Sequence, residues 1–90
     1  FISLLKALPT VITRATLGTI MICLIKPQFE LSKKQVGKNG VVKNKFLREY
    51  AVSNVVDFLI KANWTVMDTK SSPILGRSGN EEFLLSAKKK

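Results

Sequence analysis

The 90-residue sequence contains no histidine and only one cysteine, Cys23. The absence of histidine excludes the acid–base, nucleophilic and metal-binding chemistry that depends on an imidazole, and we expect no metal site. A single cysteine cannot form a disulfide within the chain, and in an apolar segment it typically packs as a small hydrophobic side chain. This cysteine usage fits a reducing compartment, so we expect a cytoplasmic protein.

The sequence also lacks an apolar run long enough to cross a membrane. Its longest such run is Ile20–Ile25, far short of the roughly 20 residues that a spanning helix needs. A secretory signal is not indicated, because Lys6, Pro9 and Arg14 interrupt the early apolar stretch. The chain begins with Phe1 rather than methionine, and we expect it to be processed or cut from a longer protein.

Acidic residues are scarce: the sequence contains 6 acidic and 15 basic residues, which gives a net charge of +9. This imbalance favours a polyanionic partner, most often nucleic acid and sometimes an anionic membrane surface. A lysine-rich solvated surface is the alternative. A chain of this length forms one small domain or a piece of a larger one, and it buries only about 60–65 % of its unfolded surface.

Apolar residues at helical spacing predict helices over residues 3–15 and 45–62. Polar residues suited to helix ends flank these segments, namely Ser3, Asn44 and Asn63. Because proline does not fit an unbroken helix interior, we expect a short first turn and then a helix with Pro9 near its first position. Gly18 is the expected C-terminal signal of this helix.

Three short segments are predicted as strands: Thr19–Ile25, Trp64–Thr69 and Glu82–Ala87. The first does not alternate, which fits a strand covered on both faces in a parallel sheet, with a buried helical segment as the alternative. The inward side chains of the other two are expected to be Trp64, Val66, Phe83 and Leu85. Residues 26–44 are predicted as a long loop with a tight turn at Asn39-Gly40. This order of elements resembles part of a doubly wound α/β sheet.

Lys26 follows the most apolar of these strands, and Pro27 favours an extended backbone at Lys26. Ligands of open α/β sheets bind outside the carboxyl ends of the strands, where a partly desolvated lysine can take a proton or stabilise an oxyanion. Glu82 opens the last strand, and we expect it to approach Lys26 at one rim of the sheet. The alternatives are a solvated lysine and an exposed edge carboxylate.

Basic side chains are concentrated between residues 26 and 48: Lys26, Lys33, Lys34, Lys38, Lys43, Lys45 and Arg48. Together with the backbone amides of Gly37 and Gly40, they suit contacts to phosphates. The candidate RNA-binding residues are Lys33, Lys34, Lys38 and Lys43. Solvated lysine loops are common, and that reading stays open.

Four segments carry a family resemblance: "FISL" at 1–4, "LIKPQFE" at 24–30, "VGKNGVV" at 36–42 and "SPILGRSGNEEFLL" at 72–85. Together they resemble the TlyA (haemolysin A) family of FtsJ-like ribosomal RNA 2′-O-methyltransferases, which use S-adenosylmethionine. The resemblance implies a partial Rossmann-like α/β fold of about three strands and two helices, with parallel and antiparallel C-terminal strands. Residues 1–87 would be the C-terminal part of the methyltransferase domain, followed by a basic tail at 88–90.

The resemblance also implies a catalytic role for two residues of a Lys-Asp-Lys-Glu tetrad. Lys26 matches the second lysine and Glu82 matches the glutamate, whereas the first lysine and the aspartate have no counterpart here. The glycine-rich cofactor turn is missing as well, so no cofactor-binding residue is identified, and catalysis by these 90 residues alone is not expected.

The partner that the family implies is ribosomal RNA or a ribosomal subunit. Two other function classes stay open, a membrane-active haemolysin and a non-catalytic RNA-binding module. If the strands before Thr19–Ile25 are absent, that strand has an unpaired edge, and we expect the chain to self-associate through it.

Overall fold

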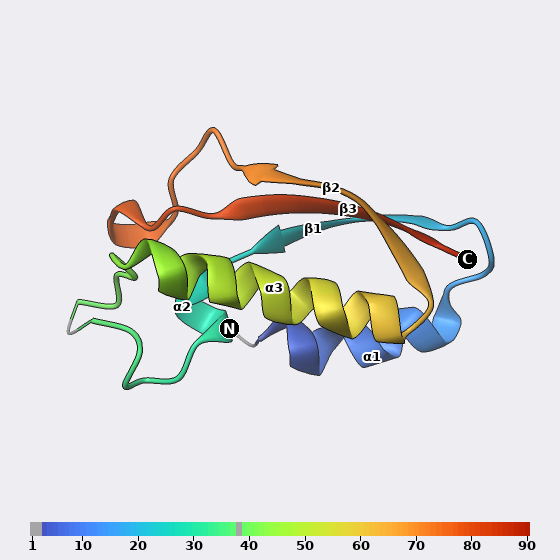
Figure 1. The fold of residues 1–90 in the computed structure, drawn as a ribbon, viewed down its shortest axis with the longest axis horizontal. Coiled ribbons are helices and arrows are strands. Elements are labelled where there is room, and N and C mark those ends of the chain that lie inside the picture. Colours follow the sequence, from blue (N-terminus) through green and yellow to red (C-terminus); the bar gives the residue numbers. More distant parts are fainter. Residues whose placement is uncertain (1–2, 38) are drawn as a thin grey trace.

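In the computed structural model, which describes residues 3–37 and 39–90, helices cover one face of a small sheet (Figure 1). The elements are α1 (Leu4–Arg14), β1 (Ile20–Ile25), α2 (Pro27–Glu30), α3 (Lys45–Lys61), β2 (Trp64–Ser71), a 3-10 turn (Arg77–Gly79) and β3 (Phe83–Lys89). The predicted α/β class is confirmed. Within the described ranges, no helix has both the length and the hydropathy that a bilayer span requires.

The last strand of the chain lies in the middle of the sheet. Across the described residues the strand order is β1-β3-β2, and β3 is antiparallel to both of its neighbours. β1 and β2 therefore run in the same direction on either side of β3, so the sheet contains strands of both directions. Phe83 of β3 is the register partner of Ile25 on one side and of Ser71 on the other.

β1 differs from the strand that its composition predicted. Its paired neighbour is the antiparallel β3, and its side chains alternate between buried and exposed. Cys23 and Ile25 face the core, whereas Ile20 and Ile22 are 61% and 74% exposed. The prediction of a strand covered on both faces is wrong for this structure, because the helices pack against one face only (Figure 1).

The core lies between the sheet and the helices. Its largest fully buried side chains include Trp64 and Leu85 from the sheet and Val55 and Leu59 from α3. Burial of each such side chain contributes about 1.5–3 kcal/mol. The predicted inward positions are confirmed, with the half-buried Val66 and Phe83 packed against this cluster.

α1 begins where the sequence predicted, but its proline does not lie at the predicted position. Ser3 caps the helix, since its Oγ accepts a hydrogen bond from the Leu5 amide. Pro9, however, lies inside α1 rather than at its start, so that prediction is wrong. The start is fixed instead by Glu30 of α2, whose carboxylate accepts hydrogen bonds from the Ser3 hydroxyl and the Leu4 amide. Glu30 is distant in sequence, so the pattern around Pro9 could not reveal this contact.

α3 has the ends that the sequence predicted. The Asn44 side chain accepts hydrogen bonds from the Phe46 and Leu47 amides, and Asn63 adopts the left-handed conformation with φ 71°. The long loop before α3 contains the short helix α2, which its sequence did not predict. The expected turn is present, because the Gly40 amide donates to the Gly37 carbonyl and Gly40 has φ 70°.

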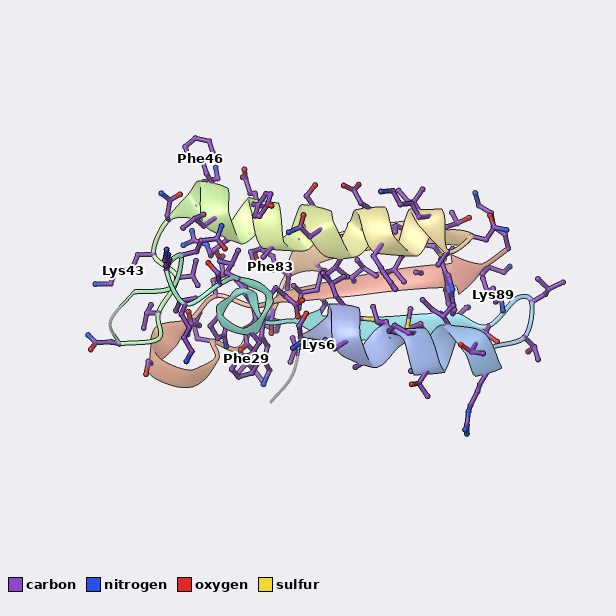
Figure 2. All side chains as sticks on the ribbon, turned by 90° about the horizontal axis from the view of Figure 1, so that it is seen from below. Lys6, Phe29, Lys43, Phe46, Phe83 and Lys89 are labelled. Atoms are coloured by element: carbon purple, nitrogen blue, oxygen red, sulfur yellow. The ribbon has the colours of Figure 1, made fainter. Side chains whose placement is uncertain are left out.

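The last residues do not form the predicted basic tail. Lys88 and Lys89 belong to β3, and the Lys90 amide donates a hydrogen bond to the Asn63 carbonyl. The Lys89 ammonium donates to the Ala15 carbonyl at 2.6 Å, at the C-terminal end of α1 (Figure 2). A cation is favoured there by the helix dipole.

Candidate active site

The register of the sheet brings the two predicted catalytic residues to one place. Ile25 is paired with Phe83, so the residues that come next at this end of the ladder are Lys26 and Glu82. Both line a single pocket of about 480 Å³. The two residues therefore lie at one rim of the sheet, as expected, while their catalytic role and a direct contact between their charged groups stay predictions.

The pocket is built from segments that lie far apart in the sequence. The corner between β1 and α2 contributes one wall, the loop before α3 the second, and the loop between β2 and β3 the third. The lining residues are Lys26, Gln28, Phe29, Asn39, Gly40, Gly76, Ser78, Asn80 and Glu82. Most of these groups are polar, so the pocket suits a ligand with hydroxyl, amide or phosphate groups.

Lys26 is held at the corner where β1 gives way to α2. Its backbone is extended, with φ −109° and ψ 99°, and the next residue, Pro27, is the buried first residue of α2. The ammonium lies 5.5 Å from the centre of the Phe29 ring, within the range of a cation–π interaction. Lys26 is half-buried, so the reading of a fully solvated lysine is not supported.

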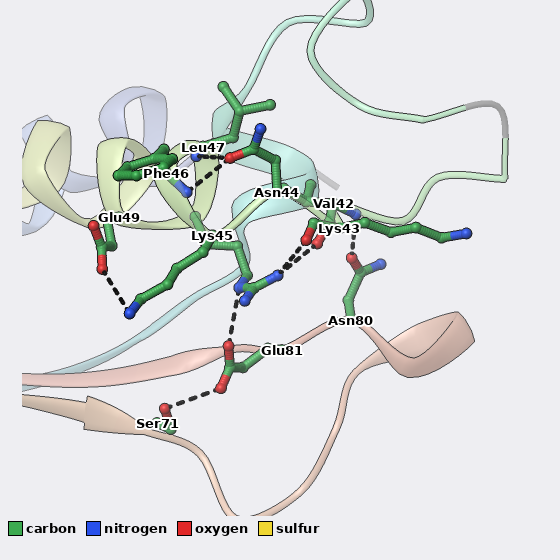
Figure 3. Close-up of polar contacts among 11 residues, drawn as sticks. Val42, Lys43, Asn44, Lys45, Phe46, Leu47, Glu49, Ser71, Asn80 and Glu81 are labelled. Carbon is green, nitrogen blue, oxygen red and sulfur yellow. Dashed lines mark hydrogen bonds and ion pairs between the residues drawn. The ribbon is translucent and has the colours of Figure 1, made fainter.

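Glu82 is a buried carboxylate with a side-chain partner from another wall. It is 5% exposed, and its Oε2 accepts a hydrogen bond of 3.0 Å from Gln28 Nε2. The neighbouring Glu81 points the other way, to Arg48 Nε at 2.9 Å and the Ser71 hydroxyl at 3.2 Å (Figure 3). The alternative of an exposed edge carboxylate is therefore not supported for Glu82.

Two further residues shape this pocket. Asn80 is 2% exposed, and its Oδ1 accepts a hydrogen bond from the Val42 amide (Figure 3). Its Nδ2 donates to the Gly40 carbonyl. Asn80 thus ties the loop before α3 to the loop before β3. Gly76 lies so close to the Glu82 carboxylate that any side chain at Gly76 would collide with it.

Three of the predicted RNA-binding lysines lie outside the pocket. Lys33, Lys34 and Lys43 are exposed on the loop before α3, and Lys38 lies outside the described residues. Lys43 extends away from the body of the molecule (Figure 2). Arg48 differs from these lysines, because its guanidinium is bound to Glu81 and to the Val42 and Lys43 carbonyls.

Sequence reasoning missed Gln28, Gly76 and Asn80. Each lies in a segment that carried the family resemblance. Gln28 and Asn80 are each two positions from a predicted catalytic residue, and that short spacing was the available signal, whereas Gly76 had no such signal. Cys23, by contrast, is a core residue: burial raises the pKa of its thiol, which favours the unreactive protonated form. Within the described part of the chain, no group of three or more metal-ligating side chains occurs.

The comparison with protein families gives this geometry its context. A family model described as FtsJ-like methyltransferase matches residues 1–89. The chain belongs to the FtsJ-like methyltransferase family. The resemblance that the "KPQFE" and "GNEEFLL" segments carried is thereby confirmed.

Relatives of this FtsJ-like chain include a 16S/23S rRNA (cytidine-2′-O)-methyltransferase TlyA from Mycobacterium tuberculosis, 40% identical over 85 residues, which cover 94% of this chain and 32% of the relative. Hemolysin A from Brachyspira hyodysenteriae is 33% identical over 84 residues, 93% of this chain and 35% of the relative. The crystal structure of a Lactococcus lactis protein described as a hemolysin matches with a TM-score of 0.94 at 32% identity, over 99% of this chain and 42% of that chain. The FtsJ-like chain thus spans well under half the length of each of these proteins.

Proposed function

We propose that this chain supplies the ribose-facing part of the active site of a ribosomal RNA 2′-O-methyltransferase. Residues 1–87 would form the C-terminal part of its methyltransferase domain. The observation that carries the proposal is the single pocket lined by Lys26 and Glu82, the two residues that match the family's tetrad. Membership of the FtsJ-like family and the net charge of +9 support the same assignment.

In the proposed reaction, the 2′-oxygen of a target ribose forms a bond to the methyl carbon of a sulfonium donor while the carbon–sulfur bond opposite breaks. The donor would leave as a thioether, and the 2′-hydroxyl loses its proton. Lys26 accepts or steers that proton, and Glu82 orients Lys26 or the hydroxyl. Such a displacement depends on positioning more than on covalent catalysis. The hydrogen bond from Gln28 and the buried position of Glu82 meet that need, because both restrict where the carboxylate can lie.

Members of the family take the methyl group from S-adenosylmethionine, and this donor is proposed from membership alone. The residues described here do not form a site for it by themselves. β1 runs directly into Lys26-Pro27, and β2 runs into Ser72-Pro73, so neither strand leads into a glycine-rich turn. We therefore assign no residue of this chain to the cofactor and expect the 90 residues alone to be inactive.

The proposed substrate is ribosomal RNA, bound in the cytoplasm. Lys33, Lys34, Lys38 and Lys43 would contact its phosphates, since three of them are exposed on the loop that also provides a wall of the pocket. Phosphate contacts of this kind position an RNA without reading its sequence.

The test uses the full-length protein that contains this chain, isotope-labelled S-adenosylmethionine and purified ribosomal subunits. We expect label in ribosomal RNA, and digestion to nucleosides should recover it as a 2′-O-methylribose. RNA binding without methyl transfer would favour the non-catalytic module instead. Release of dye from liposomes by the same preparation, without transfer of label, would favour the haemolysin.

A further inference from the structure

We infer that Gln28 is a positioning residue, whose side-chain amide fixes the Glu82 carboxylate at the wall of the pocket. The inference rests on the proposed function and deepens it, because it adds a residue that acts on the reaction through Glu82. Gln28 matches no member of the family's tetrad and carries no charge, so neither the motif nor the charge pattern assigns it a role.

The contact joins two elements that the sequence keeps 54 positions apart. Gln28 follows the buried Pro27 in the first turn of α2, where the fixed proline ring and the end of β1 restrict its backbone. Its Nε2 donates to Glu82 Oε2 at 3.0 Å. A hydrogen bond to a charged acceptor is about twice as strong as one between neutral groups, so this contact can hold the carboxylate in place.

The oxygen of the same side-chain amide indicates why the amide has this orientation. Gln28 Oε1 is buried and, among the described residues, has no hydrogen-bond partner. A buried acceptor without a hydrogen-bond partner destabilises the folded state. Turning the amide over would not remove that cost, because its oxygen would then face the acceptor oxygens of Glu82. The donor towards Glu82 therefore decides the orientation of Gln28, rather than the packing of Gln28 itself.

Gly76 packs against the Glu82 carboxylate from another side. A Cβ at position 76 would collide first with Glu82 Oε2, the oxygen that also accepts the hydrogen bond from Gln28. Both restraints therefore act on Oε2. Gln28 and Gly76 thus restrict the position of the Glu82 carboxylate from two sides of the pocket.

The experiment replaces Gln28 by Met, which keeps the side-chain length but removes the donor, in the full-length protein. We expect kcat for methyl transfer to fall about 10–100-fold, because a misplacement of 1 Å can cost about a hundredfold. The Kd for RNA should stay within about twofold, since the proposed phosphate contacts come from the exposed lysines of the loop before α3 rather than from Gln28. Gln35→Met is the matched control, because the Gln35 side chain bonds only locally, to the Ser32 amide and hydroxyl, and it should leave kcat unchanged.

The variant Gln28→Glu tests whether Gln28 positions the Glu82 carboxylate or only fills space. It matches glutamine in size but sets a second carboxylate against Glu82, so we expect a larger loss of kcat than for Gln28→Met. If Gln28 only fills space, both variants would keep kcat near that of the unmodified protein, and the inference would be overturned.

A double-mutant cycle with Glu82→Met tests whether the effect passes through Glu82. We expect the double variant to match Glu82→Met alone, and independent, multiplicative losses would contradict the inference. The same cycle measured by urea denaturation needs no activity and should also be non-additive. If the unmodified protein transfers no methyl group, the proposed function fails, and the denaturation cycle alone decides whether Gln28 and Glu82 are coupled.

Discussion

At the scale of single residues, the pocket depends on small and uncharged groups as much as on Lys26 and Glu82. Asn80 uses both ends of its amide, one to accept from the Val42 amide and one to donate to the Gly40 carbonyl. Because Asn80 is buried, water cannot replace these bonds if the side chain is lost. Asn80 therefore holds the loop before α3 against the loop before β3.

Gly76→Ala should disturb the active site without straining the backbone. The added methyl group collides with the Glu82 carboxylate, and the glycine itself does not have a positive φ. We expect a loss of kcat for methyl transfer of at least about tenfold, because displacing a catalytic group by 1 Å can cost about a hundredfold.

Gly79→Ala is the matched control for this change. Gly79 has φ 83° and nothing within 4 Å of an added Cβ, so that variant is strained but leaves Glu82 in place. It should lower stability by about 1 kcal/mol and keep kcat. Equal effects of the two variants on kcat would contradict the assigned role of Gly76.

The sequence allowed Lys26 and Glu82 to be selected because charge and a motif marked them. Gln28, Gly76 and Asn80 could not be selected in the same way. The roles of Gln28 and Asn80 come from contacts with residues that are distant in sequence, such as Val42 for Asn80, and that of Gly76 comes from the close approach of a carboxylate in the folded chain. Neither periodicity nor composition carries information on such contacts.

At the scale of elements, helix ends were predictable where the capping residue is local. Asn44 and Asn63 act within their own helix, and both predictions are confirmed. The start of α1 was only half predictable, because Glu30 reaches it from α2. β1 was mispredicted for a related reason: a run such as "IMICLI" fits burial on both faces, and only the tertiary arrangement decides whether both faces are covered.

Glu30→Ala should destabilise the protein by loosening the start of α1 from α2. The variant leaves the Leu4 amide and the Ser3 hydroxyl without their partners, and we expect a loss of about 1–3 kcal/mol in the free energy of unfolding. Urea denaturation of the full-length protein measures this loss.

Glu49→Ala provides the control for this comparison. Glu49 forms only an exposed pair with Lys45 at 3.9 Å, and such pairs contribute between about 0 and 1 kcal/mol. If the two variants unfold at the same urea concentration, Glu30 does not anchor α1.

At the scale of the whole molecule, the excess of positive charge should contribute to RNA binding mainly through the loop that carries Lys33, Lys34 and Lys38. Neutralising these three lysines together in the full-length protein should weaken RNA binding and flatten its salt dependence, because each phosphate contact releases counterions. The measurement is the slope of log affinity against log salt concentration.

A control with equal loss of charge neutralises Lys6, Lys61 and Lys70, which are exposed on α1, α3 and β2. It should leave most of the slope intact. Equal slopes for the two triple variants would mean that net charge, rather than this loop, binds the RNA.

The open side of the sheet should make the isolated chain associate. β1 has a paired neighbour on one side within the described residues, and its outward face presents Ile20 and Ile22. An unpaired apolar edge strand can pair with another chain. We expect the 90 residues to sediment as an oligomer at micromolar concentration and Ile22→Lys to shift them towards monomer.

Ile60→Lys, at a 53% exposed position of α3, is the control for this substitution and should not change the oligomer. A monomeric 90-residue chain at the same concentration would show that the edge of β1 is protected in another way.

The most direct test of the account is the rate of methyl transfer to ribosomal RNA by Lys26→Met, measured beside Lys33→Met in the full-length protein. Both variants lose one positive charge, but only Lys26 lines the pocket with Glu82. The account predicts a fall in kcat of about 10²–10⁴-fold for Lys26→Met, the usual contribution of a positioned acid or base. Lys33→Met should keep kcat and weaken only RNA binding. A Lys26→Met variant that transfers methyl groups at the unmodified rate would contradict the assignment of this pocket as the active site.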